Sequence, residues 1–167
     1  IYSPDDGRSM GLQGMINDML EKADFATGMN LNGEVDRISS KDQKAIATLI
    51  SAAENNPEGF IPVHKKIEEQ LAKHTAPVLG ITGTGGAGKS SLVDELVRRF
   101  LLEFTDKTIA IISVDPSKRK TGGALLGDRI RMNAIRNPRV YMCSLATRQS
   151  NLALSKHVKE AVSIVQA

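Results

Sequence analysis

Eight consecutive residues, from Gly83 to Ser90, follow the phosphate-binding pattern G-x-x-x-x-G-K-[ST]. Glycine permits the backbone conformations that turn successive N–H groups toward one point, and a helix N-terminus adds the positive end of its dipole. Lys89 would bring a mobile ammonium to the β- and γ-phosphates of a nucleotide, and the Ser90 hydroxyl would ligate a magnesium ion on the same oxygens. The pattern therefore predicts a nucleotide-phosphate site with Mg²⁺.

The neighbours of this loop supply the context that the pattern requires. The apolar run from Val78 to Ile81 predicts a buried strand over residues 78–82, and apolar residues at helical spacing predict a helix over 90–104, with Ser91 in its first turn. The alternative is a glycine-rich turn that happens to precede a Lys-Ser pair. The two flanking elements favour the phosphate-binding interpretation.

A second group of polar residues follows the apolar run 108–114, which suits a strand covered on both faces. Asp115 leaves the end of that strand, where its carboxylate could reach the magnesium ion directly or through water. Asp128 ends a glycine-rich segment and could contact the metal or the attacking water when that segment closes. Local pattern alone leaves these aspartates open, since Asp-Pro also initiates turns and Gly-Asp also precedes helix caps.

Residues 77–167 alternate between strand and helix patterns, which predicts an α/β fold with a parallel sheet. The predicted strands cover 78–82, 108–114 and 139–143, and the predicted helices cover 90–104 and 152–165. In such sheets ligands bind at the carboxyl ends of the strands, where the glycine loop and Asp115 emerge.

Two segments precede this part of the chain. Residues 1–24 predict a turn at 3–7 and then a helix with Met10, Met15 and Met19 among the residues of its buried face. Residues 25–76 predict a helical linker in which Ser39, Ser40 or Asp42 caps a first helix and the Asn-Asn-Pro-Glu-Gly sequence at 55–59 separates it from a second. Because position 1 is not Met and the last residues continue an apolar helical pattern, we expect an internal piece of a longer protein.

Composition excludes several classes of function. The 22 Lys and Arg and 19 Asp and Glu residues are mostly interspersed, so charge does not indicate a nucleic-acid or membrane partner. Cys143 is the only cysteine, which rules out an intrachain disulfide and suits a reducing cytoplasmic location. No signal peptide or membrane-length apolar run is visible in the sequence.

The segment from Val78 to Met132 resembles the P-loop GTPases that act as chaperones of adenosylcobalamin-dependent acyl-CoA mutases, the methylmalonyl-CoA mutase-associated type. The resemblance is carried by the glycine loop, by Val-Asp-Pro-Ser at 114–117 and by the long Thr-Gly-Gly to Arg-Met string at 121–132. The order of segments resembles that of fused mutases of this family. It implies that residues 1–24 end a cobalamin-binding domain, 25–76 form a linker, and 77–167 form the first half of a G domain.

The resemblance also implies roles for particular residues. Asp115 and Asp128 match the acidic metal-site positions, Ser90 ligates Mg²⁺, and Lys89 and Asp128 take part in catalysis. The implied phosphate-binding set is Gly85, Gly86, Ala87, Gly88, Lys89, Ser90 and Ser91.

For the intact protein the resemblance implies GTP or GDP with Mg²⁺, and adenosylcobalamin in the cobalamin-binding domain. It further implies contacts with that domain and with a mutase domain that acts on an acyl-CoA, and a homodimer. GTP hydrolysis would be coupled to loading and protection of the cofactor. Two other functions remain open at this stage, namely an ATP-using P-loop enzyme such as a small-molecule kinase, and a nucleotide-binding module without hydrolysis.

Overall fold

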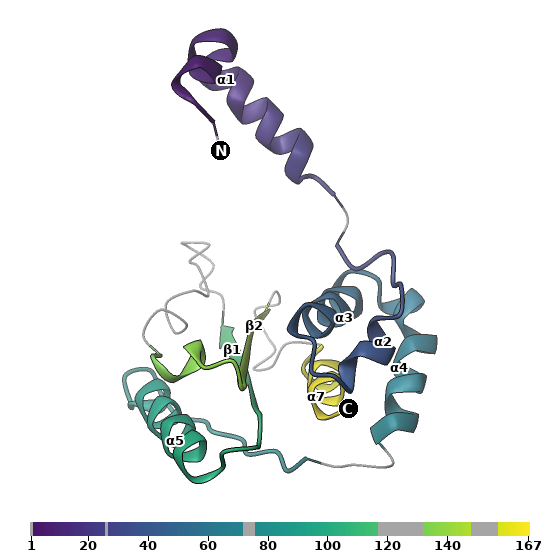
Figure 1. The fold of residues 1–167 in the computed structure, drawn as a ribbon, viewed down its shortest axis with the longest axis vertical. Coiled ribbons are helices and arrows are strands. Elements are labelled where there is room, and N and C mark those ends of the chain that lie inside the picture. The colour runs from purple at the N-terminus through teal and green to yellow at the C-terminus, as the bar shows by residue number, and fades with distance from the viewer. Residues whose placement is uncertain (1, 26, 72–75, 117–131, 148–156) are drawn as a thin grey trace.

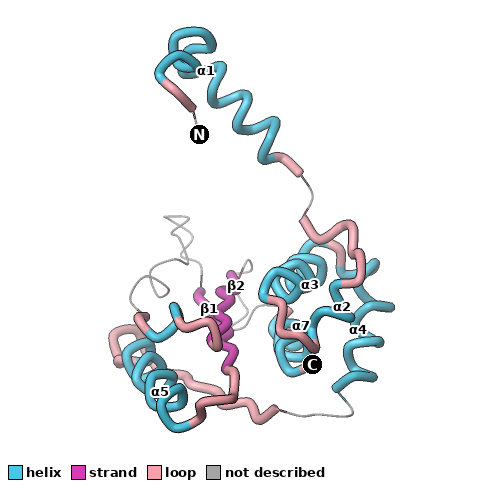
Figure 2. The backbone as a smooth tube through the Cα atoms, viewed as in Figure 1, coloured by secondary structure: helices cyan, strands magenta, loops and turns pink. Residues whose placement is uncertain are grey.

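The computed structural model describes residues 2–25, 27–71, 76–116, 132–147 and 157–167 (Figure 1). Within them, strands β1 (Ile109–Pro116) and β2 (Val140–Thr147) form a small sheet. Helices α3 (Gln43–Asn55), α4 (Pro57–Leu71) and α7 (Val158–Gln166) lie on one side of it. Helix α5 (Lys89–Glu103) and the short 3-10 helix η1 (Ala134–Arg136) lie on the other, which gives a layered α/β arrangement (Figure 2).

The two strands are parallel, as the alternation of patterns predicted. Their register runs from Ile109 opposite Val140 to Pro116 opposite Thr147. The Ile109 amide also donates to the Arg139 carbonyl oxygen at 3.0 Å, so pairing begins at the first residue of β1. Because parallel strands end at a common edge, the carboxyl ends of β1 and β2 meet there.

The predicted strand at 78–82 is wrong. Residues 76–84 have no regular secondary structure, and 63% of Val78 and 75% of Leu79 are exposed. An extended segment becomes a strand only when a neighbour pairs with its backbone N–H and C=O groups. Among the described residues the sheet contains β1 and β2 alone, and neither pairs with this run.

Of the three residues predicted as possible caps of the first linker helix, Asp42 is confirmed. The Asp42 carboxylate caps α3, where Oδ1 accepts from the amides of Lys44 at 2.9 Å and Ala45 at 3.3 Å. Helix α3 ends at Asn55, and Pro57 begins α4 after Asn56, whose side-chain oxygen accepts from the Gly59 amide at 3.1 Å. The break predicted at 55–59 is therefore confirmed but shorter than expected, because α4 already includes Pro57, which is tolerated in the first turn of a helix.

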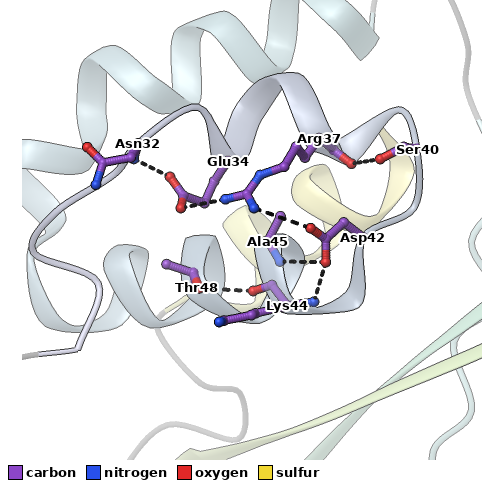
Figure 3. A network of polar contacts seen from close by, with 8 residues as sticks. All are labelled: Asn32, Glu34, Arg37, Ser40, Asp42, Lys44, Ala45 and Thr48. Atoms are coloured by element: carbon purple, nitrogen blue, oxygen red, sulfur yellow. Dashed lines mark hydrogen bonds and ion pairs between the residues drawn. The ribbon is translucent and has the colours of Figure 1, made fainter.

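The short helix α2 (Glu34–Ile38) was not predicted from the sequence. Glu34, only 8% exposed, accepts a hydrogen bond from Arg37 Nη2 at 2.8 Å and another from the Asn32 amide (Figure 3). Arg37 Nη1 also lies 3.5 Å from a carboxylate oxygen of Asp42. This network joins α2 to the N-terminus of α3.

A hydrophobic core connects helices α2, α3, α4 and α7 to the sheet. Its fully buried side chains include Leu49 of α3, Ile67 of α4, Leu145 of β2 and Ile164 of α7. The Gln43 side chain adds a polar connection, since Nε2 donates to the carbonyl oxygens of Pro138 and Val140 at 3.4 Å each. The residues assigned to a linker therefore pack in the same core as β2 and α7, while the boundary at 77 stays a prediction.

Helix α1 (Pro4–Ala23) stands apart from the layers in Figure 1. The turn predicted at 3–7 is wrong, because Ser3 caps this helix and Pro4 opens its first turn. Its predicted buried face is wrong within the described chain, because none of its residues is buried and 47% of Met19 is exposed. Gly11, at φ 65°, interrupts the helical conformation, so the two halves of α1 do not share one straight apolar stripe. None of the helices in the described ranges has the length and apolar content that a membrane span needs.

Candidate functional site

The glycine loop leads directly into the first turn of α5. Gly86 and Gly88 have φ values of 80° and 83°, in the left-handed region where glycine is the favoured residue. A Cβ atom at either position would have no heavy atom within 4 Å, so backbone conformation rather than crowding accounts for glycine there. The loop residues 83–88 are all exposed. Their backbone is therefore open to a close approach by a ligand.

Helix α5 begins without a side-chain cap. Gly88 occupies the N-cap position and has no side chain to accept a hydrogen bond from the first turn. Helical hydrogen bonding starts with the Leu92 amide, which donates to the Gly88 carbonyl oxygen at 2.9 Å. The first turn contains no acidic residue, while Lys89 contributes a positive charge. Backbone donors, the helix dipole and the ammonium all favour an anion at this end of α5.

Lys89 lies across the loop in this structure. Its Nζ atom donates to the carbonyl oxygen of Thr84 at 2.8 Å, and the Ala87 amide donates to the same oxygen at 3.3 Å. A Cβ built at Gly83 would lie 3.5 Å from Lys89 Cδ, which shows how closely the stem passes over the loop backbone. The Lys89 ammonium is thus held over the loop whose backbone would bind a phosphate.

The structure places the remaining predicted residues unevenly. Ser90 is half-buried and Ser91 exposed, and both lie in the first turn of α5. Asp115 is the second-last residue of β1, and its backbone lies opposite Ala146 at the carboxyl edge of the sheet. Asp128 lies outside the described residues, as do the rest of residues 117–131, with the glycine-rich segment that Asp128 ends, and residues 152–156 of the last predicted helix. Over the described ranges, no group of three His, Cys, Asp or Glu side chains could hold a metal ion.

Two side chains that the sequence analysis did not identify anchor α5. Asp94, which follows Lys89 along the same helix, accepts a hydrogen bond from the Ala134 amide at 2.9 Å and joins α5 to η1. The Arg139 guanidinium donates to the carbonyl oxygens of Leu101 at 2.9 Å and Lys107 at 3.1 Å, and also to that of Phe104. Such bonds to distant backbone carbonyls leave no signature in sequence spacing. The helix that carries Lys89 and Ser90 is therefore held at two points along its length.

An exposed ion-pair cluster lies between these two anchors. Glu95 accepts from Arg98 Nε at 2.7 Å and from Arg99 Nε at 2.7 Å. These hydrogen bonds lower the pKa of the Glu95 carboxyl from 4.5 to about 2, and the bond with Arg98 has the larger effect. The cluster is a surface feature of α5 rather than part of the phosphate site.

Comparison with known proteins identifies similar proteins whose descriptions agree with one another. The family model of methylmalonyl-CoA mutase-associated GTPase MeaB matches residues 45–167. Fused isobutyryl-CoA mutases of Geobacillus kaustophilus and Cupriavidus metallidurans are 58% and 49% identical over the whole chain, which covers 16% and 15% of their lengths. A Pyrococcus horikoshii protein described as a GTPase is 40% identical over 80% of this chain and 41% of its own. The chain thus spans about one sixth of the length of the two fused relatives.

Proposed function

The chain belongs to the family of methylmalonyl-CoA mutase-associated GTPases MeaB, and we propose that its loop at 83–91 binds GTP with Mg²⁺ and promotes hydrolysis of the γ-phosphate. The observation that carries the proposal is the loop geometry. Two left-handed glycines lead into an uncapped helix N-terminus, and Lys89 lies over the loop with its ammonium 2.8 Å from the Thr84 carbonyl oxygen. Each of these features favours a bound polyphosphate.

The chain's own groups would act mainly by positioning and by electrostatics. Backbone amides of residues 85–91 would bind the phosphate oxygens and hold them in one geometry. When the nucleotide enters, Lys89 exchanges the Thr84 carbonyl for a β- or γ-phosphate oxygen, which is a stronger, charge-assisted partner. The same ammonium then stabilises the charge that develops on the phosphoryl group as an ordered water attacks in line.

The donor set also fits a magnesium ion, which prefers oxygen ligands and retains several waters. We propose the Ser90 hydroxyl as a direct ligand, and Asp115 and Asp128 as further ligands or as acceptors from metal-bound water. Bound Mg²⁺ would neutralise charge on the β- and γ-phosphate oxygens. Asp115 supports this assignment by its backbone position at the carboxyl edge of the sheet.

At the level of the intact protein, we propose that this GTPase serves an adenosylcobalamin-dependent acyl-CoA mutase, with isobutyryl-CoA mutase as the favoured case. The fused isobutyryl-CoA mutases that match the whole chain support the proposal. Hydrolysis would be coupled to cofactor loading and protection, in contact with cobalamin-binding and mutase domains. A homodimer and a cytoplasmic location belong to the same proposal.

Replacement of Lys89 by alanine in the full-length natural protein tests the loop assignment. Because the ammonium acts on charge that grows in the transition state, we expect GTP turnover to fall by on the order of 100-fold. Phosphate release measures turnover, and calorimetry with GTP and ATP measures affinity and base preference. Lys65→Ala, which removes an exposed charge from α4, is the matched control. Turnover and GTP affinity equal to those of the unsubstituted protein would reject the site.

The metal assignment has its own readout. Asp115→Ala and Asp128→Ala should raise the Mg²⁺ concentration that half-maximal hydrolysis requires, with a smaller effect on nucleotide affinity. A magnesium titration that superimposes on that of the unsubstituted protein would contradict the proposed role of the aspartate concerned. Tighter binding of ATP than GTP would instead favour an ATP-using enzyme, and binding without phosphate release would favour a non-hydrolytic module.

A further inference from the structure

A groove of about 470 Å³ lies between the second half of α5 and η1. It is separate from the phosphate loop, because its α5 residues begin more than two turns after Lys89. Its lining residues are Arg98, Leu101, Leu102, Asn133, Ala134, Arg136, Asn137 and Arg139. Three of these are arginines and none is acidic, which gives the groove a positive charge.

The three arginines contribute in different ways. Arg139 forms part of the wall, since its guanidinium is committed to backbone carbonyls at the end of α5. Arg98 shares its charge with Glu95 through hydrogen bonds of 2.7 and 2.8 Å, although 59% of its side chain stays exposed. Arg136 is exposed and has no ion pair within the described part of the chain. Arg136 and Arg98 can therefore meet a carboxylate from outside.

An apolar surface lies beside these charges. Leu102 is 69% exposed and Leu101 is half-buried, so two leucines of one helix face the arginines of the groove. Arginine next to exposed apolar side chains is typical of protein docking sites, where an apolar anchor is desolvated and charges at the rim set orientation. Among the described residues that line the groove, none is aromatic and able to stack on a nucleic-acid base.

We propose that this groove, the arginine groove, docks an acidic protein segment that carries an apolar anchor residue. The anchor would pack on Leu101 and Leu102, and flanking carboxylates would pair with Arg98 and Arg136. The open form of the groove suits a protein segment better than a small molecule, which usually has most of its surface enclosed. This inference is independent of the nucleotide site.

A fluorescent peptide that alternates glutamate with leucine provides the probe, and its glutamine counterpart provides the uncharged comparison. Fluorescence anisotropy with the full-length natural protein measures binding at low and high salt. We expect the acidic peptide to bind at least tenfold more tightly than the amide peptide at low salt, with the difference shrinking as salt screens the charges. Arg136→Glu should weaken binding about fivefold or more, because one attractive pair becomes repulsive.

Two controls make the result specific. Lys65→Glu makes the same charge change on α4, across the sheet, and should leave peptide binding unchanged. A photoreactive benzoylphenylalanine at position 102 should cross-link the acidic peptide, whereas the same group at Met29, which is 51% exposed, should not. Because Arg136 has no ion pair among the described residues, Arg136→Glu should unfold at the temperature of the unsubstituted protein.

The proposal is overturned if the acidic and amide peptides bind equally, or if Arg136→Glu binds the acidic peptide as the unsubstituted protein does. Cross-linking at position 29 as strong as that at position 102 would equally remove the groove as the site. Anionic vesicles or a single-stranded oligonucleotide that bind through Arg136 more tightly than the peptide would assign the surface to a different class of partner.

Discussion

The loop before α2 depends on a glycine that approaches another backbone closely, and this makes a quantitative prediction possible. Gly28 has φ 78°, and a Cβ atom there would lie 2.5 Å from the amide nitrogen and 2.6 Å from the Cα of Ala52 in α3. Gly33 has nearly the same φ, 77°, but its Cβ would meet only a flexible Asp36 oxygen at 3.8 Å. The two positions therefore share one conformational cost and differ in crowding.

Alanine at either position must adopt the left-handed conformation, which costs about 1–2 kcal/mol. At position 28 the new methyl group must also displace backbone atoms, a form of overpacking that adds about 1–3 kcal/mol. The loop is further held by Asn55, whose side-chain nitrogen donates to the Thr27 hydroxyl at 2.9 Å, so it cannot move away without losing that bond. We expect Gly28→Ala to lower the free energy of unfolding by about 3 kcal/mol and Gly33→Ala by about 1 kcal/mol.

Equilibrium unfolding in urea, followed by circular dichroism, measures both changes. The comparison requires equal m-values in the two variants and the unsubstituted protein, which indicates that the same surface is exposed on unfolding. If Gly28→Ala and Gly33→Ala lower the free energy of unfolding by the same amount within about 0.5 kcal/mol, the close contact with Ala52 does not determine the cost of a side chain at position 28.

Two further predictions concern α5. Arg139→Met should lower the free energy of unfolding by about 2–3 kcal/mol, mostly through loss of the partly buried hydrogen bond to the Leu101 carbonyl. Arg139→Lys should recover less than half of this loss, because an ammonium cannot span three carbonyl oxygens. Equal stability of the Met and Lys variants in urea unfolding would contradict this reasoning. Glu95 has a depressed pKa, so its ion pairs stabilise the fold fully above about pH 4.5 and lose this effect as the pH falls toward 2. The difference in free energy of unfolding between the unsubstituted protein and Glu95→Gln should therefore be constant near neutral pH and disappear in acid. Urea unfolding at a series of pH values measures this difference. A difference that stays constant down to acid pH would refute the prediction.

Features that depend on neighbouring residues were predictable from the sequence. The Asp42 cap, the break before Pro57 and the start of α5 after the glycine loop each rest on bonds between residues a few positions apart. The parallel pairing of β1 and β2 was also predicted, because the alternation of strand and helix patterns over residues 77–167 favours a parallel sheet. In these cases local sequence contains the interaction that forms the element.

Features that depend on distant partners were not predictable. The run at 78–81 is apolar enough for a strand, but strand formation needs a paired neighbour, and the described sheet provides none for it. The apolar residues of α1 were expected to be buried, yet burial requires a surface to cover them. Arg139 was missed because its acceptors lie 32 to 38 residues away along the chain. Asp115 and Asp128, the candidate metal ligands, stay predictions.

The shared core of α3, α4, β2 and α7 also constrains how this sequence can change over time. Leu49, Ile67, Leu145 and Ile164 are each at most 1% exposed and belong to one cluster, so a gain in volume at one position must be offset at another. These positions should covary among homologues although up to 115 residues separate Leu49 from Ile164. A gene fusion that joins such a GTPase to another domain would therefore have to include the whole sequence from α3 onward. A fusion junction just before the glycine loop would separate α3 and α4 from β2 and α7 and so divide this core.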